Sequence, residues 1–437
     1  MKLNKLAALV AITAASGSAF ATNGYFSHGY GMKAKGMAGV ATASASDAFG
    51  GANNPASMVW AGDRLDLGLD WFSPKRSAAR SGGAFGAGML DGTATSGSNN
   101  FYVPEFGYNK MLGWDMSVGV TVYGNGGMNT DYPNGQTDTG LCTAGAPSGA
   151  LTSNMLCGNT RLGVDLMQLV IAPTFAMKIN KDHSLGISPL IGYQRFKAEG
   201  LQAFDNAGFS ASRGNVTNRG YDSAHGFGLR LGWMGKVSDT VTLGAAYSTK
   251  IKMSKFGKYQ GLFAEQGDFD MPENYNLGVS WKVTPSLTMG LDYQTINYAK
   301  VASVGNASNS PGAFGASNGA GFGWSNVSVV KLGAEYQYSG VLTLRAGYSW
   351  GKNPIQARDI TVNILAPGVI ADHATLGFTY KVSKDSELTM AYTHALKHSV
   401  SGATSFDRLF PVPAGTFGTE RIEMYQNSLG IAYGLKF

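Results

Sequence analysis

The stretch 429–437 reads LGIAYGLKF and alternates strictly between two kinds of side chain. Large apolar residues occupy its odd positions, and glycine, alanine and one lysine occupy its even positions. In a β-strand these two sets lie on opposite faces, so that one face is apolar and the other is small or polar. Such a strand suits a barrel in lipid, although a soluble protein can also contain one amphipathic strand.

The same alternation recurs in segments of roughly ten residues, as is typical of transmembrane strands. Clear examples are 65–71, 116–122, 227–233, 342–350 and 374–382. Short connections lie near 110–113, 180–183, 237–240, 284–286, 339–341 and 383–386, and they alternate with long connections. Because outer-membrane barrels have short periplasmic turns and long outer loops, residues 63–437 predict an all-β, antiparallel transmembrane barrel of about fourteen strands, with both chain ends on the periplasmic side.

The first 21 residues have the pattern of an export signal. Lys2 and Lys5 precede an apolar run over 6–15, and Ala19-Phe20-Ala21 fits a small-x-small cleavage site. We therefore expect residues 1–21 to be a signal peptide. No later stretch approaches the ~20 consecutive apolar residues that a transmembrane helix needs, so the exported chain is secreted, periplasmic or a barrel in an outer membrane.

Composition favours the barrel. Charged residues make up 14% of the chain, against about 25% in soluble proteins, and glycine accounts for 61 of 437 residues, about twice its usual share. Glycine inside strands indicates tight bends or crowded interior faces. The formal charge of +6 is not concentrated in a basic block, so nucleic acid is not expected as a partner.

Two cysteines, Cys142 and Cys157, lie in one segment rich in glycine, serine and threonine. In an oxidising compartment we expect them to form a disulfide that closes a loop of roughly 15 residues and stabilises the fold by about 3 kcal/mol. Two cysteines without nearby histidines make a poor metal site, and the sequence predicts no metal and no cofactor.

Residues 22–62 do not alternate, and they precede the first strand. They contain many large apolar side chains, which are Tyr25, Phe26, Tyr30, Met32, Met37, Phe49, Met58 and Trp60. Because a disordered tail would have few such residues, the segment predicts a plug, or hatch, folded inside the barrel lumen.

Apolar residues also occur where a water-filled porin would be polar. Leu190 and Phe196 lie on the predicted interior face of one strand, and Phe204 and Phe263 lie in predicted outer loops. The other apolar loop residues are Leu201, Phe209, Leu262, Phe269, Val362, Ile364, Leu365, Val369 and Ile370. The interior residues pack against the plug or form a ligand pocket, and the loop residues pack together or form a capture groove.

One pair of opposite charges is predicted inside the barrel. A short turn at 339–341 sets Glu335 opposite Arg345 on neighbouring strands. We interpret this pair as structural, although Arg345 could instead receive a carboxylate headgroup. The other interior cations by strand parity are Arg230, Lys250, Lys252 and Lys381.

Together, the export signal, the plug and the strands resemble the FadL/TodX-type outer-membrane transporters of long-chain fatty acids and hydrophobic hydrocarbons. Three stretches carry the resemblance, in this order: GANNPA at 51–56, YGNGGMNT at 123–130 and NILAPGV at 363–369. The similarity covers essentially the whole chain after the signal peptide. It implies a location in the outer membrane of a Gram-negative bacterium.

The resemblance also implies a mechanism of passive uptake. In that family an outer hydrophobic groove captures the ligand, an inner pocket then takes it, and movement of the plug's N-terminal part frees it. A kink in the third strand opens the wall, so that cargo leaves sideways into the membrane. Here the third strand runs into Gly124, Gly126 and Gly127, which suit a kink, and the family's plug motif corresponds to Asn54-Pro55-Ala56, beside that kink.

The family's inner pocket uses basic groups for a carboxylate. The segment GYQRFK at 192–197 resembles the fifth-strand segment that supplies one, and Arg195 is the matching position. A regular strand would turn Arg195 outward with Tyr193, so this assignment requires a bulge or the upper end of the strand. The predicted ligand-binding residues are Leu190, Arg195, Phe196, Lys197, Phe204, Phe263 and Arg345.

Fatty acids are the expected cargo, with uncharged aromatic or aliphatic hydrocarbons as the alternative. A polar porin conflicts with the interior apolar residues and the plug. A lipid hydrolase has little support, because none of the six histidines lies in a serine-nucleophile or metal-ligand motif. We expect a monomer without enzyme activity that contacts outer-membrane lipid and lipopolysaccharide and takes hydrophobic small molecules as partners.

Overall fold

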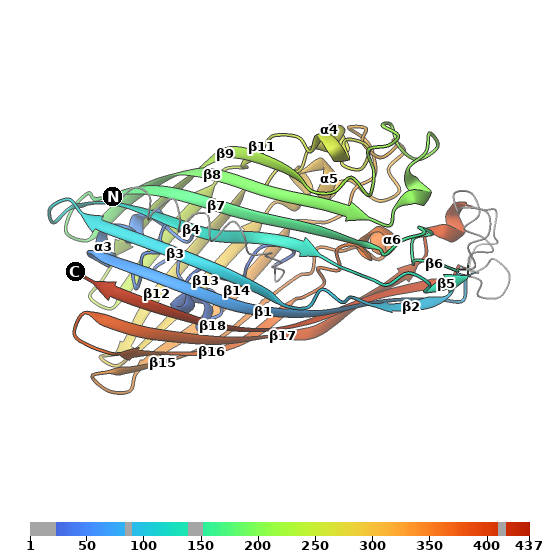
Figure 1. The fold of residues 1–437 in the computed structure, drawn as a ribbon. Coiled ribbons are helices and arrows are strands. Elements are labelled where there is room, and N and C mark those ends of the chain that lie inside the picture. Colours follow the sequence, from blue (N-terminus) through green and yellow to red (C-terminus); the bar gives the residue numbers. More distant parts are fainter. Residues whose placement is uncertain (1–22, 84–89, 139–151, 410–416) are drawn as a thin grey trace.

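The alternating segments form fourteen long antiparallel strands that close into a barrel, as predicted (Figure 1). The computed structural model describes residues 23–83, 90–138, 152–409 and 417–437. The barrel strands are β1 (Arg64–Ser81), β3 (Phe101–Met111), β4 (Met116–Asn129), β7 (Gly163–Lys178), β8 (His183–Glu199), β9 (Asp222–Lys236), β10 (Val241–Ser248), β12 (Asn274–Thr284), β13 (Leu287–Ile296), β14 (Val327–Gln337), β15 (Leu342–Gly351), β16 (Asp372–Lys381), β17 (Ser386–Ala403) and β18 (Thr419–Lys436). The ring closes where β18 pairs with β1.

Alternation along each strand turns one face to lipid and the other to the lumen. On β1, Leu69 and Trp71 are 45% and 39% exposed, whereas Asp70 between them is 3% exposed. On β18, the odd-numbered residues of 429–435 are exposed in the same way. The lipid interior offers no hydrogen-bonding partner, and a closed barrel satisfies its backbone groups between its own strands.

The two ends of the barrel differ. The connections at one end are short turns, and the C-terminus lies at this end (Figure 1). The other end carries β2 (Gly92–Thr95), β5 (Thr137–Asp138), β6 (Thr152–Ser153), η3 (Gln202–Phe204), β11 (Lys252–Met253), η4 (Gly257–Tyr259), α4 (Ala264–Gly267), η5 (Tyr298–Lys300), α5 (Ala302–Gly305), η6 (Ala357–Asp359), α6 (Ile360–Asn363) and η7 (Phe406–Leu409). In outer-membrane barrels the long loops are extracellular. Among the described residues, no helix is both long and apolar enough to cross a membrane.

Residues 23–62 lie inside the barrel and are mostly buried (Figure 1). They contain α2 (Met32–Lys35), η1 (Pro55–Ser57) and α3 (Met58–Ala61). Asn54 caps η1, because its side-chain oxygen accepts a hydrogen bond from the backbone N–H of Ala56 at 3.1 Å. Its amide donates to the carbonyl oxygens of Thr42 (2.7 Å) and Trp233 (2.9 Å), which ties the plug to β9. Residues 1–22, with the expected signal peptide, lie outside the described residues.

A ring of inward-facing glycines lets the plug touch the barrel wall. The ring consists of Gly107, Gly119, Gly186, Gly232, Gly244, Gly278, Gly290, Gly333, Gly347, Gly377 and Gly430. Several are direct cross-strand neighbours, such as Gly186 with Gly232. A Cβ atom on Gly186 would lie 2.3 Å from the carbonyl carbon of Pro55, so a larger residue would collide with plug backbone. The interior faces are therefore crowded, as the glycine content predicts.

Replacing Gly186 by valine should dislodge η1 from the wall while the barrel still folds. The added side chain overlaps the backbone of Pro55 and Ala56, which cannot yield without moving the plug. We expect backbone hydrogen exchange over 52–58 to accelerate by about tenfold or more, together with a larger single-channel conductance. The matched control is Gly340→Val, because a Cβ atom on Gly340 meets nothing within 4 Å. Exchange and conductance equal to those of the control would contradict the wall-contact account.

Candidate functional site

An apolar groove lies among the extracellular loops. Its volume is about 460 Å³, within the range of small-molecule pockets. Its larger apolar side chains are Leu156, Leu201, Phe204, Phe209, Phe314, Val362, Leu365 and Phe406. Phe204 packs edge-on against Phe209 and Phe314, with ring centroids 5.5 and 5.8 Å away. We call this feature the loop groove, and its lining includes several of the apolar loop residues noted in the sequence.

A column of aromatic rings leads inward from the loops. Phe196 of β8 contacts Phe263 at 4.6 Å between ring centroids, and Phe263 contacts Phe269 at 4.8 Å. Phe269 then contacts Tyr25 of the plug at 6.1 Å, and Tyr25 contacts Trp324 at 5.7 Å. We call these rings the aromatic column. Leu190 belongs to the same buried cluster as these rings.

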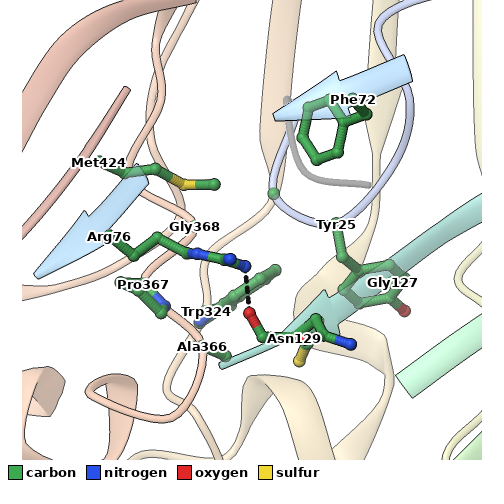
Figure 2. A pocket seen from close by; sticks show the side chains of 12 residues that line it. Tyr25, Phe72, Arg76, Gly127, Asn129, Trp324, Ala366, Pro367, Gly368 and Met424 are labelled. Carbon is green, nitrogen blue, oxygen red and sulfur yellow. Dashed lines mark hydrogen bonds between the residues drawn. The ribbon is translucent and has the colours of Figure 1, made fainter. Parts of the chain in front are cut away.

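A small cavity lies beside the end of the aromatic column (Figure 2). Its volume is about 20 Å³, enough for about one water molecule. It is lined by Gly24, Tyr25, Phe72, Arg76, Gly127, Met128, Asn129, Trp324, Ala366, Pro367, Gly368 and Met424. We call it the inner cavity. Its lining comes from the plug, from the wall strands β1, β4 and β18, and from two loops.

The segment 360–370 separates the loop groove from the inner cavity. Leu365 lines the groove, and the next three residues, 366–368, line the cavity. The hydroxyl of Thr130 donates to the carbonyl oxygen of Leu365 at 2.8 Å, and the indole of Trp324 donates to Asn363 Oδ1 at 2.6 Å. The segment therefore borders both spaces and is held there by these two hydrogen bonds.

The barrel wall is discontinuous between β3 and β4. Their ladder runs from Met111–Ser117 to Phe106–Val122 and is not continued by the outer half of either strand. The pairing of β4 with β7 continues to Asn129, across a bulge between Gly124 and Gly126. We call the unpaired stretch between β3 and β4 the seam. The glycines identified as a kink thus lie at a bulge on its edge, which increases local bending.

The N-terminal plug segment covers the seam from inside. The N–H of Ser27 donates to the carbonyl oxygen of Asn125 at 3.2 Å, and the N–H of Gly127 donates to the carbonyl oxygen of Tyr25 at 3.1 Å. The hydroxyl of Tyr298 accepts from the N–H of Tyr25 at 3.1 Å, which braces the segment from behind. A Cβ atom on Gly126 would lie 1.7 Å from the carbonyl oxygen of Tyr25, so this close approach requires glycine.

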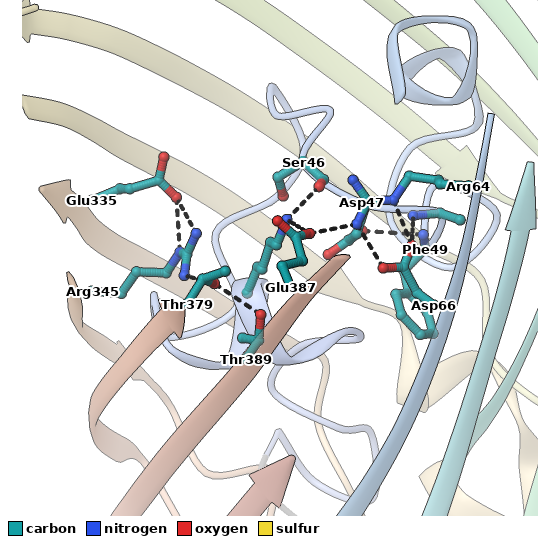
Figure 3. Close-up of polar contacts among 12 residues, drawn as sticks. Ser46, Asp47, Phe49, Arg64, Asp66, Glu335, Arg345, Thr379, Glu387 and Thr389 are labelled. Atoms are coloured by element: carbon teal, nitrogen blue, oxygen red, sulfur yellow. Dashed lines mark hydrogen bonds and ion pairs between the residues drawn. The ribbon is translucent and has the colours of Figure 1, made fainter. Parts of the chain in front are cut away.

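The rest of the plug is held by buried ion pairs. Lys35 Nζ lies 2.9 Å from Asp70 Oδ2 and 2.6 Å from Glu105 Oε1. Glu387 Oε1 lies 2.6 Å from Lys33 Nζ and 2.7 Å from Arg64 Nη2, and it connects the plug to β1 and β17 (Figure 3). Separating a buried ion pair costs much free energy because it leaves an unpaired charge in the interior, so these contacts anchor α2.

The predicted Glu335–Arg345 pair is confirmed. The two residues are direct cross-strand partners, and Arg345 Nη2 lies 2.7 Å from Glu335 Oε2. Arg345 Nη1 also donates to the hydroxyl of Thr379 at 2.6 Å (Figure 3). The N–H donors of Arg345 thus bind residues of the barrel wall, which agrees with the structural interpretation. Arg345 does not line the inner cavity.

Two basic residues lie on the opposite face from the one that the family resemblance requires. Strand β8 stays regular through Phe196, which pairs with Leu166 and Asp222, so no bulge turns Arg195 inward. Arg195 instead stacks its guanidinium on the ring of Tyr221, 3.7 Å from the centroid, and Lys197 lies 5.4 Å from the same ring. Both therefore lie on the outer face of β8, and the inner-pocket assignment is corrected.

The Asn54-Pro55-Ala56 motif also lies elsewhere than expected. It packs against Gly186 of β8 and Gly232 of β9, whereas residues 25–27 cover the bulge in β4.

Two functional candidates were not predicted from the sequence, namely Arg76 and the plug residues 25–27. Strand parity could have identified Arg76, because on β1 it lies on the same inward face as Asp70. The pairing of residues 25–27 with β4, by contrast, has no local sequence signal.

Cys157 is disulfide-bonded in the structure. Its predicted partner Cys142 lies outside the described residues. Within the described part of the chain, no group of three or more His, Cys, Asp or Glu side chains could hold a metal ion.

Comparison with known proteins gives the chain a family. A family model described as "Outer membrane protein transport protein (OMPP1/FadL/TodX)" matches residues 7–420. The chain belongs to this family. It is an outer-membrane β-barrel, as the exposed apolar faces of its strands also indicate.

Individual relatives are distant in sequence. The putative outer membrane protein NMB0088 of Neisseria meningitidis serogroup B is 29% identical over 114 residues, which span 26% of this chain and 24% of that protein. The P. putida toluene transporter TodX aligns over 94% of this chain and 99% of its own, with 18% identity and a TM-score of 0.69. The Ralstonia pickettii toluene transporter TbuX aligns over 94% of this chain and 99% of its own, with 18% identity and a TM-score of 0.63. A Pseudomonas aeruginosa FadL homologue aligns over 95% of this chain and 100% of its own, with 16% identity and a TM-score of 0.67.

The plug contains a buried histidine that must remain neutral. His28 stacks on His373 with ring centroids 5.5 Å apart, and its Nε2 lies 3.2 Å from the hydroxyl of Thr393. Burial, followed by the nearby ammonium groups of Lys35 and Lys331, lowers the pKa of His28 to about 3. Because an unfolded histidine titrates near pH 6.5, the stabilisation from neutral His28 is complete above that pH and is lost as pH falls toward 3.

Acidification should therefore loosen the plug around His28. Between about pH 7 and about pH 4, hydrogen exchange over 23–35, corrected for its intrinsic pH dependence, should accelerate in the wild type. His28→Gln should flatten this response, because glutamine has no proton to gain. His225→Gln is the matched control, since His225 is exposed on β9. An unchanged pH response in His28→Gln would show that other groups loosen this segment.

Proposed function

We propose that the protein takes up hydrophobic small molecules across the outer membrane by a passive route, as a monomer, and that long-chain fatty acids are its main cargo. Uncharged hydrocarbons are the second candidate, because the structural relatives TodX and TbuX are toluene transporters. The observation that carries the proposal is the apolar path from the loop groove, past the segment 360–370, to the inner cavity and the seam, with the aromatic column beside the inner cavity. A polar solute would find few partners along this path.

The proposed route uses the features in spatial order. The loop groove captures the ligand, which then passes the segment 360–370 toward the inner cavity. The space between these features is filled by side chains, so transport requires movement. The N-terminal plug segment is the part best suited to move, because backbone hydrogen bonds hold it to the seam whereas buried ion pairs hold α2. Its withdrawal would open a lateral exit between β3 and β4.

The plug argues against a general porin. Its wall contacts run around the inner circumference, from Gly119 of β4 to Gly430 of β18, so they leave little room for a wide aqueous channel. Ions would also meet the aromatic column. We therefore expect no steady, large conductance from the protein while the plug is in place.

The serine motifs in the described part of the chain do not have the geometry of a hydrolase. Two Gly-x-Ser-x-Gly patterns occur, at 315–319 and 347–351. In the second, Ser349 Oγ lies 3.1 Å from His373 Nδ1, but both side chains are fully buried and the serine lies within β15. The first lies in an extracellular loop. Neither pattern occupies the strand–turn–helix that exposes a serine nucleophile.

Uptake by a host that lacks its own fatty-acid transporter tests the proposed function. Expression of this chain should restore oleate uptake, with toluene entry measured in parallel. Oleate uptake supports the fatty-acid assignment, and toluene entry alone supports the hydrocarbon alternative. Failure of both, with the barrel correctly inserted, would overturn the proposal.

Replacing Gly126 by valine tests the lateral exit. A Cβ atom there would lie 1.7 Å from the carbonyl oxygen of Tyr25, so the side chain would displace residues 25–27 and would itself fill the space that the ligand must cross, while the ion pairs of α2 remain intact. Uptake should fall by about tenfold or more, with normal barrel insertion. Gly340→Val again serves as the control, because its side chain meets open space. Undiminished uptake in Gly126→Val would exclude the seam as the route.

A further inference from the structure

We propose that Arg76 is the group that receives the headgroup of an anionic hydrophobic ligand in the inner cavity. This inference rests on the proposed function and deepens it, because it names long-chain carboxylates as the ligand class. It also places the cation on β1, rather than at the β8 position suggested by the family resemblance.

Arg76 is a buried cation in an apolar setting. Its side chain points into the barrel and is 4% exposed. Around it, the inner cavity is lined by Phe72, Met128, Trp324 and Met424 (Figure 2). A buried guanidinium is costly unless it is paired with an anion or fully hydrogen-bonded. The position therefore requires an explanation.

Four other buried cations are paired with carboxylates. Lys35, Arg64, Arg80 and Arg345 each lie within 2.9 Å of an aspartate or glutamate oxygen. Among the described residues, Arg76 forms no ion pair with a carboxylate. It donates to the carbonyl oxygens of Asn129 and Ser98, and its Nε has no hydrogen-bond partner. The guanidinium thus retains its positive charge, and its Nε–H donor is unpartnered.

Two more buried cations lack a carboxylate ion pair but face the plug. Arg230 donates to the carbonyl oxygens of Gly51 and Ala52, and Lys331 Nζ donates to that of His28 at 2.9 Å. These contacts hold plug backbone in place. The acceptors of Arg76 instead belong to β4 and to the loop before β3, so they border the seam. Arg76 is therefore placed to meet a ligand on the proposed route.

The location suits a headgroup. Gly127 and Asn129 line one side of the inner cavity just beyond the bulge, and residues 366–368 line the side toward the loop groove. A carboxylate held at Arg76 would leave an apolar tail against Trp324 and Tyr25. Because the cavity holds about one water molecule, headgroup entry requires Tyr25 or the 366–368 loop to move aside. Tyr25 also closes the seam, so binding and opening would use the same displacement.

The test compares two probes of equal chain length, oleate and oleyl alcohol, bound to the purified full chain at a pH where oleate is ionised. The wild type should bind oleate more tightly than the alcohol. In Arg76→Gln, oleate affinity should fall by about tenfold or more, and alcohol affinity should change little, because only the anion uses the guanidinium charge. Lys75→Gln is the matched control, since it removes a neighbouring cation from the outer face of β1 and should leave both affinities unchanged.

Several results would overturn the inference. Equal affinities of the wild type for oleate and oleyl alcohol would overturn it. Because this comparison needs no variant, the test stays decisive even if Arg76→Gln fails to fold. Equal losses for both probes would show that Arg76 only supports the wall, and unchanged oleate binding would remove it from the site. Tight alcohol binding with toluene entry but no oleate binding would overturn the inference and leave hydrocarbon transport intact. Failure of all uptake and binding would instead overturn the proposed function.

Discussion

The close contact between plug backbone and glycine wall is the constraint on which the rest of the structure depends. A fourteen-stranded ring is wide enough to leave a lumen, and a plug must fill it without expanding the barrel. Inward glycines such as Gly186 and Gly347 leave the space that side chains would otherwise occupy, so the backbone at Pro55 and Met37 reaches the sheet directly. The high glycine content is thus a condition for a sealed barrel.

The plug is attached unevenly, and this unevenness divides it into a fixed and a movable part. Buried Lys35 and half-buried Lys33 form ion pairs with the wall, where loss of a partner would leave a charge unpaired. Residues 25–27 are instead uncharged, and they are held by backbone hydrogen bonds to β4 and by the packing of the Tyr25 and Phe26 rings. Uncharged contacts can separate without leaving an unpaired charge in the interior, whereas breaking a buried ion pair does leave one. The gate is therefore expected at the uncharged end of the plug, beside the seam.

Periodicity in the sequence determines much of this architecture. Alternation and loop lengths predict the strand number, and turn length alone sets Glu335 opposite Arg345. The same rule, applied without exception, turns Arg195 outward. The family resemblance was wrong where it required a bulge that β8 lacks, and again where it placed the Asn54-Pro55-Ala56 motif beside the kink in β4. The plug is different, because its contacts join residues far apart in the chain. Neither the packing of Asn54 on β9 nor the cover that Tyr25 gives to β4 follows from local pattern.

An unpaired seam in a membrane has a physical consequence for the gate. Backbone groups that face a lipid interior without partners cost several kcal/mol each, so an open seam is unstable by itself. The carbonyl of Asn125 and the N–H of Gly127 are satisfied by the plug, and withdrawal of residues 25–27 removes both bonds at once. A ligand that displaces the segment must offset this loss with its own contacts. On the proposed route, the unsatisfied groups would favour the return of the plug once the ligand has left, so the seam would reclose without an external energy source.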